Sequence, residues 1–206
     1  MTQEKGIIIT ARVISMIFTP FYLPLVGLIV LFLFSYMKML PWPYKLEVLL
    51  ITYLFTIFMP YALTHLYRRI QGWTRWELSH KHRRLVPYAI FIMCYMLCIW
   101  VLNQLNIFHF IRIIIIAALL IQTVCALINL GWKVSTHTAG VGGVAGALLA
   151  FAELFHYNPV WWLTLVLIVA GMLGSARIIL RQHSLGQVMG GFAIGFLCAG
   201  VSILYL

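Results

Sequence analysis

The chain has 206 residues, of which 64% are hydrophobic and only 9% are charged. Soluble domains contain about 45–50% apolar and about 25% charged residues, so this composition excludes a soluble enzyme, a disordered tail and a nucleic-acid-binding domain. The net charge is +10, and all four acidic residues are glutamates, which excludes an Asp nucleophile and an Asp-rich magnesium site and predicts a basic integral membrane protein.

Seven mostly apolar runs are candidates for membrane-spanning helices, because a span needs about 20 mostly apolar residues. Their continuous hydrophobicity favours helices over the alternating strands of a membrane barrel. The third, fifth and sixth runs are short, which for the fifth and sixth suggests tilted or partly recessed helices. In chain order the runs are Val13–Met37, Leu46–Leu66, Val86–Leu102, Ile113–Leu130, Thr138–Phe155, Trp161–Gly174 and Leu185–Leu204.

These runs predict an all-α polytopic membrane protein, a bundle of about six to seven transmembrane helices. The connections are short, so residues 1–206 are expected to form a single membrane domain. The segment Ile7–Thr19 is expected to lie at the membrane surface and lead into the first helix. Pro20 and Pro24 lack an N–H donor and have a fixed φ, so they are expected to kink or start that helix.

Polar residues are costly in a membrane protein and mark functional sites, and here they gather in three clusters at helix ends. The first cluster, residues 74–87, contains the cations Arg75, Lys81, Arg83 and Arg84. It is either a basic loop that contacts anionic lipid headgroups or a phosphate-binding site.

The second cluster opens the helix of the fifth run with Lys133, Ser135 and His137. The first N–H groups of a helix have no partner in the helix, and its dipole favours an anion there. The cluster is therefore either a capped helix start at the water boundary or an anion site.

The third cluster contains Arg177, His183 and Gln187 before and within the last run. His183 and Gln187 are four residues apart, so they share a face if the segment is helical. The Gln187 carbonyl is then able to accept a hydrogen bond from one imidazole nitrogen. The alternative is a basic interfacial loop with a satisfied histidine.

Topology and small residues link the three clusters. Two spans separate each cluster from the next, so all three are expected on the same side of the membrane. Small residues four apart allow two membrane helices to approach closely, and three such pairs follow the second and third clusters. They are Gly142/Gly146, Gly186/Gly190 and Gly191/Gly195. Packing of these two helices would bring His137 near His183.

At these residues the chain resembles the type 2 phosphatidic acid phosphatase (PAP2) superfamily. The family has a Lys and Arg-Pro element, a Pro-Ser-Gly-His element and a Ser-Arg-x5-His-x3-Asp element, in that order. Arg177 and His183 keep the Arg-x5-His spacing, and Ser135, Thr136 and His137 match the second element with Val134 in the Pro position.

The match to the first family element is weak, and the match to the third differs from the family pattern at two positions. Lys81 is nearer than the family spacing, and Arg83 or Arg84 with Pro87 stands for the Arg-Pro pair. Ala176 replaces the family Ser, and Gln187 replaces the Asp that orients the nucleophilic histidine.

The resemblance implies a metal-independent lipid phosphatase without a cofactor. His183 would attack phosphorus to form a phosphohistidine, with Gln187 fixing its tautomer, and His137 would serve as general acid and then base. The substrate phosphate would be held by cations and donors from all three clusters. These are Lys81, Arg83, Arg84, Lys133, Ser135, Thr136 and Arg177.

The resemblance implies a lipid phosphate partner, and the sequence does not choose among phosphatidic acid, phosphatidylglycerol phosphate, an isoprenoid diphosphate and a lipid A type phosphate. An alternative function is a catalytically weakened relative that binds or transports lipid, which the neutral Gln187 favours. No nucleic acid partner is expected, and the sequence does not define an oligomeric state.

Two observations give opposite predictions for the side of the membrane that the site faces. The predicted site side carries eleven of the 14 Lys and Arg residues, which under the positive-inside rule places the site in the cytoplasm. Several of these cations would be phosphate ligands, however, and the resemblance implies the outer face of a bacterial inner membrane. We expect the inner membrane, with the site on the periplasmic face.

Overall fold

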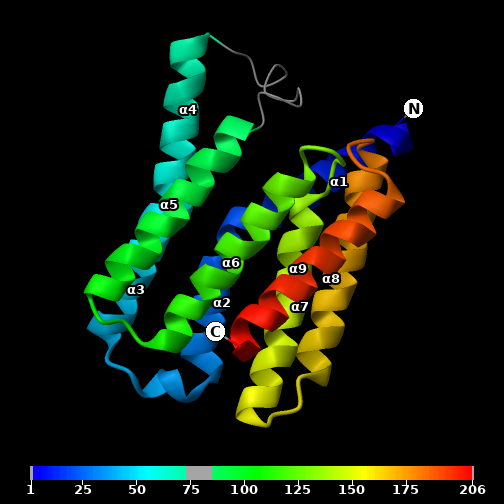
Figure 1. The fold of residues 1–206 in the computed structure, drawn as a ribbon. Helices are drawn as coiled ribbons and strands as arrows, with labels where there is room; N and C mark the ends of the chain where they lie inside the picture. Colours follow the sequence, from blue (N-terminus) through cyan, green and yellow to red (C-terminus); the bar gives the residue numbers. More distant parts are fainter. Residues whose placement is uncertain (1, 73–84, 206) are drawn as a thin grey trace.

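The computed structural model describes residues 2–72 and 85–205, and within these ranges the chain is helical without strands. Seven stretches are long and apolar enough to cross a membrane, which confirms the all-α polytopic architecture (Figure 1). The α-helices are α1 (Thr2–Ile17), α2 (Leu23–Phe34), α3 (Trp42–Tyr53), α4 (Met59–Gln71), α5 (Leu85–Gln104), α6 (His109–Ile128), α7 (Thr136–Phe155), α8 (Val160–Ile179) and α9 (Leu185–Tyr205).

Prolines shape the first two stretches. Between α1 and α2 the helix is interrupted, and Pro20 begins the short 3-10 helix η1 (Pro20–Tyr22), while Pro24 lies in the first turn of α2. This confirms the predicted effect of both prolines. In the second stretch, a π-helical turn η3 (Leu54–Phe58) joins α3 to α4 just before Pro60, where the wider turn accommodates a residue that cannot donate a backbone hydrogen bond.

Three spans predicted as short are full-length helices in the structure. The sixth run, predicted to end at Gly174, continues as α8 to Ile179, and the fifth and third are α7 and most of α5. The apolar runs therefore underestimate the lengths of these helices. Helix α8 continues through Ala176 and Arg177, both of which are compatible with a helix, and the Arg177 side chain contacts Ser15 of α1.

One end of the bundle collects the segments that carry the predicted site. The N-terminus, the α6–α7 connection and the α8–α9 connection lie together at that end, and α4 ends and α5 begins there as well (Figure 1). The second and third clusters therefore lie on the same side, as expected. The first cluster falls almost entirely in residues 73–84, outside the described residues.

The α7–α9 pair forms the most extensive contact between helices, and glycine makes it possible. A Cβ at Gly142 would meet the carbonyl oxygen of Phe192, and one at Gly195 would meet that of Ala139. The two backbones are therefore in direct contact, which confirms the predicted packing of these helices. The Gly186/Gly190 pair does not take part, because a Cβ at Gly190 would lie 2.7 Å from the Trp132 ring instead.

Candidate active site

The start of α7 is held by Ser135, which caps the helix. Its Oγ accepts a hydrogen bond from the Thr138 backbone N–H at 3.4 Å, and the Thr138 hydroxyl donates to the Ser135 carbonyl at 3.0 Å. Ser135 is completely buried, and Thr136 is half-buried. Ser135 thus satisfies one of the orphan donors of the helix start and orients the first turn, in which His137 lies.

The start of α9 is a capping box formed by Ser184 and Gln187. The Ser184 Oγ accepts from the Gln187 N–H at 3.4 Å, while the Gln187 Oε1 accepts from the Ser184 N–H at 3.2 Å. Such reciprocal bonds satisfy two orphan donors at once. The Ser-x-x-Gln spacing is a recognisable signal for this motif, but the sequence analysis missed it.

The same Gln187 oxygen contacts His183. The distance from His183 Nδ1 to Gln187 Oε1 is 3.2 Å, as the four-residue spacing predicted. Because this oxygen only accepts hydrogen bonds, Nδ1 carries the proton and the ring lone pair is on Nε2. Gln187 therefore combines a structural function, capping α9, with control of the His183 tautomer.

Two hydrogen bonds tie the second cluster to the third. The Ser135 N–H donates to the Gln187 carbonyl at 3.3 Å, and the Lys133 ammonium donates to the Gln182 carbonyl at 2.6 Å. Lys133 thus helps to position the α8–α9 connection. With the glycine-mediated contact of α7 and α9, these bonds fix the two helix starts relative to each other.

His137 and Arg177 meet beside the N-terminal helix. Arg177 Nη1 donates to the Ser15 Oγ at 2.7 Å, and the Ser15 backbone accepts a hydrogen bond from the His137 ring. Both Arg177 and His183 are close enough to His137 to act on it electrostatically. His137 Nδ1 and Arg177 Nε are buried without a hydrogen-bond partner among the described residues, so two polar atoms here have capacity for a ligand.

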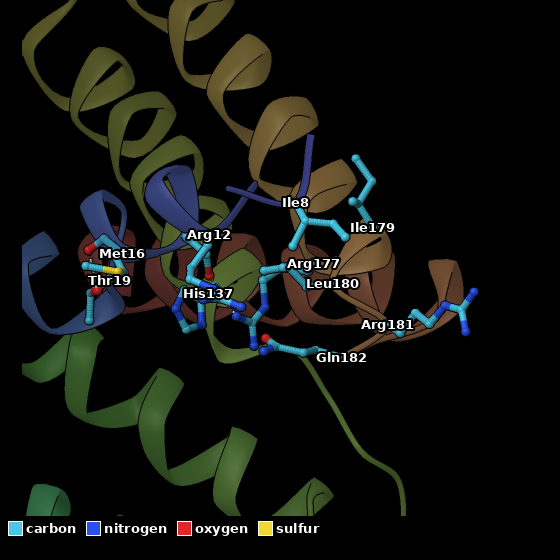
Figure 2. A pocket seen from close by; sticks show the side chains of 11 residues that line it. Ile8, Arg12, Met16, Thr19, His137, Arg177, Ile179, Leu180, Arg181 and Gln182 are labelled. Atoms are coloured by element: carbon cyan, nitrogen blue, oxygen red, sulfur yellow. Dashed lines mark hydrogen bonds between the residues drawn. The ribbon is translucent and has the colours of Figure 1, made fainter. Parts of the chain in front are cut away.

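A cavity of about 630 Å³ opens at this point. Figure 2 shows side chains from α1, α7 and α8 around it, with His137 and Arg177 close together. Its described lining contains three arginines and one histidine, no acidic residue, and apolar side chains beside them. The lining residues are Ile8, Arg12, Ser15, Met16, Thr19, His137, Arg177, Ile179, Leu180, Arg181 and Gln182.

Of the predicted site residues, His137 and Arg177 line the cavity, whereas His183 and Gln187 lie outside its lining, with His183 close enough to His137 to act on it electrostatically. Ser135 and Lys133 act on the backbone around them rather than lining the cavity. The predicted phosphate ligands Lys81, Arg83 and Arg84 lie outside the described residues. In the part of the chain that the structure describes, no three His, Cys, Asp or Glu side chains are grouped to hold a metal ion.

The contribution of α1 to the cavity was not predicted from the sequence. Arg12 and Ser15 both line the cavity, and they are three residues apart, which places them on one face of the helix. A cation and a hydroxyl at this spacing in an otherwise apolar segment were the available signal.

Comparison of the chain with protein-family models, with curated proteins and with solved structures finds no match.

Proposed function

We propose that this protein is a membrane lipid phosphatase of the PAP2 type, which hydrolyses a phosphomonoester or diphosphate through a phosphohistidine. The observation that carries the proposal is the convergence of two histidines and an arginine beside a cationic cavity at one end of the bundle. His137 comes from α7, Arg177 from α8 and His183 from the start of α9. Phosphoryl transfer needs mainly positioning and charge stabilisation, which such a constellation supplies.

The reaction begins with attack of His183 Nε2 on phosphorus. The N–P bond forms as the bond from phosphorus to the lipid oxygen breaks, and His137 donates a proton to that leaving oxygen. His137 then removes a proton from water, whose oxygen attacks phosphorus and releases inorganic phosphate and free His183. Arg177 neutralises charge on the phosphoryl oxygens, and Gln187 keeps the His183 proton on Nδ1.

The substrate class follows from the mixed lining of the cavity. Apolar side chains such as Ile8, Met16 and Leu180 stand beside the arginines, so an amphipathic phosphate is suited to it. Phosphatidic acid, phosphatidylglycerol phosphate, an isoprenoid diphosphate and a lipid A type phosphate all have this character. We place the protein in a bacterial inner membrane with the site facing the periplasm, where the excess of cations at the site end serves phosphate binding.

Phosphate release by the purified protein tests this proposal. The four lipid classes, labelled in the phosphate, are incubated with wild-type protein in detergent with EDTA, quenched in alkali and analysed by mass spectrometry. We expect release from at least one lipid in EDTA, and a phosphoryl group on His183. No release from any lipid, release that EDTA abolishes, or label on a different residue would contradict the mechanism.

Substitutions at Gln187 separate an active phosphatase from a weakened lipid-binding or transport protein, the function that a neutral residue at this position favours. In Gln187→Asp a carboxylate faces Nδ1 and stabilises the cationic imidazole, so kcat is expected to rise about tenfold. In Gln187→Ala the His183 tautomer is no longer fixed, and kcat is expected to fall about 100-fold. This is the loss seen when a metal-ligating histidine loses the residue that orients it.

Thermal unfolding is measured on the same variants, because Gln187→Ala also removes half of the capping box and costs about 1 kcal/mol of helix stability. Equal phosphate release by all three proteins would show that Gln187 is only a helix cap. Absence of release from all three would favour the binding or transport protein.

A further inference from the structure

The N-terminal helix α1 supplies part of the cavity from outside the three clusters. Ser15 is 7% exposed, and its hydroxyl lies 2.7 Å from Arg177 Nη1 across a sequence separation of 162 residues. α1 packs against α8 over a substantial contact. This contact is therefore built into the fold and is not a chance approach of two surface side chains.

Ser15 holds the guanidinium of Arg177 without cancelling its charge. An arginine has five N–H donors in a rigid fork, and the neutral Ser15 hydroxyl accepts from one nitrogen only. A carboxylate in the same place would bind the fork and neutralise it. The full positive charge thus remains for an anion in the cavity, and the buried Nε that has no partner in the described part of the chain points to the same unsatisfied capacity.

Arg12 brings a second guanidinium to the cavity, from α1. It lies three residues before Ser15, lines the cavity and is exposed, and Figure 2 shows it beside His137. Arg12 on α1 and Arg177 on α8 therefore flank the same space. A doubly charged phosphoryl group between them would contact both helices at once.

We propose that α1 is a wall of the substrate site, in which Arg12 binds phosphoryl oxygens and Ser15 is a positioning residue for Arg177. The identification of this phosphate group as part of the substrate rests on the proposed function. The binding of a phosphate group by α1 stands independently of turnover. The phosphate group that α1 binds belongs either to the substrate in the cavity or to a lipid headgroup of the surrounding bilayer. The experiment distinguishes binding in the cavity from general binding at the basic end of the bundle.

The first measurement is stabilisation of the detergent-solubilised protein by inorganic phosphate, with chloride at equal ionic strength as reference. Arg12→Gln is expected to weaken apparent phosphate affinity about tenfold, the loss typical of one hydrogen bond to a charged group. Ser15→Ala is expected to weaken it by a similar factor with little change in unfolding temperature without phosphate, and Ser15→Thr, which keeps the hydroxyl, should restore it.

Arg69→Gln is the matched control, because Arg69 is an exposed arginine in the last turn of α4 and does not line the cavity. Unchanged phosphate affinity in Arg12→Gln would overturn the proposal. An equal loss in Arg69→Gln would overturn it as well, because it would indicate a general attraction of phosphate to the basic end of the bundle. Failure of Ser15→Thr to restore affinity would overturn the role of the hydroxyl.

Kinetics then connect the site to turnover. With the substrate identified, Arg12→Gln is expected to raise KM about tenfold. A fall in kcat at unchanged KM would overturn the assignment of Arg12 to binding. If wild type binds phosphate through Arg12 but releases none from any lipid, the proposed reaction fails while the α1 site stands.

Discussion

Replacement of His183 by alanine is expected to lower phosphate release by at least about four orders of magnitude, because the nucleophile of a covalent mechanism has no substitute. Loss of the nucleophile in an enzyme with a covalent intermediate costs about 10⁶-fold in kcat, with residual rate from binding and charge stabilisation. The comparison is made in detergent with EDTA at saturating substrate. The covalent phosphoprotein should disappear together with the activity.

The matched control for His183→Ala is His109→Ala. His109 is an exposed histidine in the first turn of α6, at the end of the bundle away from the cavity. This control should keep phosphate release within a factor of two. If His183→Ala retains more than about one hundredth of wild-type activity, His183 is not the nucleophile.

A side chain at Gly195 is expected to destabilise the protein more than any other single methyl group added to α9. The Cβ of Gly195→Ala would lie 2.7 Å from the Ala139 carbonyl carbon and 2.8 Å from the Gly143 nitrogen, both backbone atoms of α7. Because backbone atoms of a packed helix cannot turn aside, the helices must separate. Overpacking of this kind costs about 1–3 kcal/mol even where side chains adjust, so about 3 kcal/mol or more is expected here.

Gly200→Ala on the same helix is the control, since a Cβ there would meet nothing within 4 Å. Thermal unfolding in detergent should show a markedly lower midpoint for Gly195→Ala and an unchanged or slightly raised one for Gly200→Ala. Activity should fall with Gly195→Ala as well, because the Ser135 N–H to Gln187 carbonyl bond spans the same interface. Equal midpoints for the two variants would contradict the described packing.

Local spacing in the sequence predicts some of these features well. Apolar runs predict the existence of the spans, and the four-residue spacing of His183 and Gln187 predicts their contact. Glycine spacing predicts the α7–α9 contact, although it does not distinguish Gly191/Gly195, which meets α7, from Gly186/Gly190, which faces Trp132. That difference depends on helix rotation, which only the packed structure sets.

Contacts between distant residues are not predictable in this way. The Ser15–Arg177 hydrogen bond joins α1 to α8, and the spacing of Arg12 and Ser15 marks a polar face of α1 without identifying Arg177 as its partner. Helix ends are also set by capping and by tertiary contacts, and α8 continues beyond the apolar run that predicted it, through Arg177, which contacts Ser15. The roles of Lys81, Arg83 and Arg84 stay predictions from the resemblance.

The bond between Ser15 and Arg177 also bears on biosynthesis. Ribosomes add about 5–20 residues per second, so the 162 residues between the two partners correspond to about 8 to 30 seconds. During that interval α1 has no α8 to pack against, and its exposed apolar side chains, among them Ile9 and Met16, favour residence at the membrane interface. The cavity is completed only when the last helices insert, so a nascent chain that stops before α8 has no assembled phosphate site.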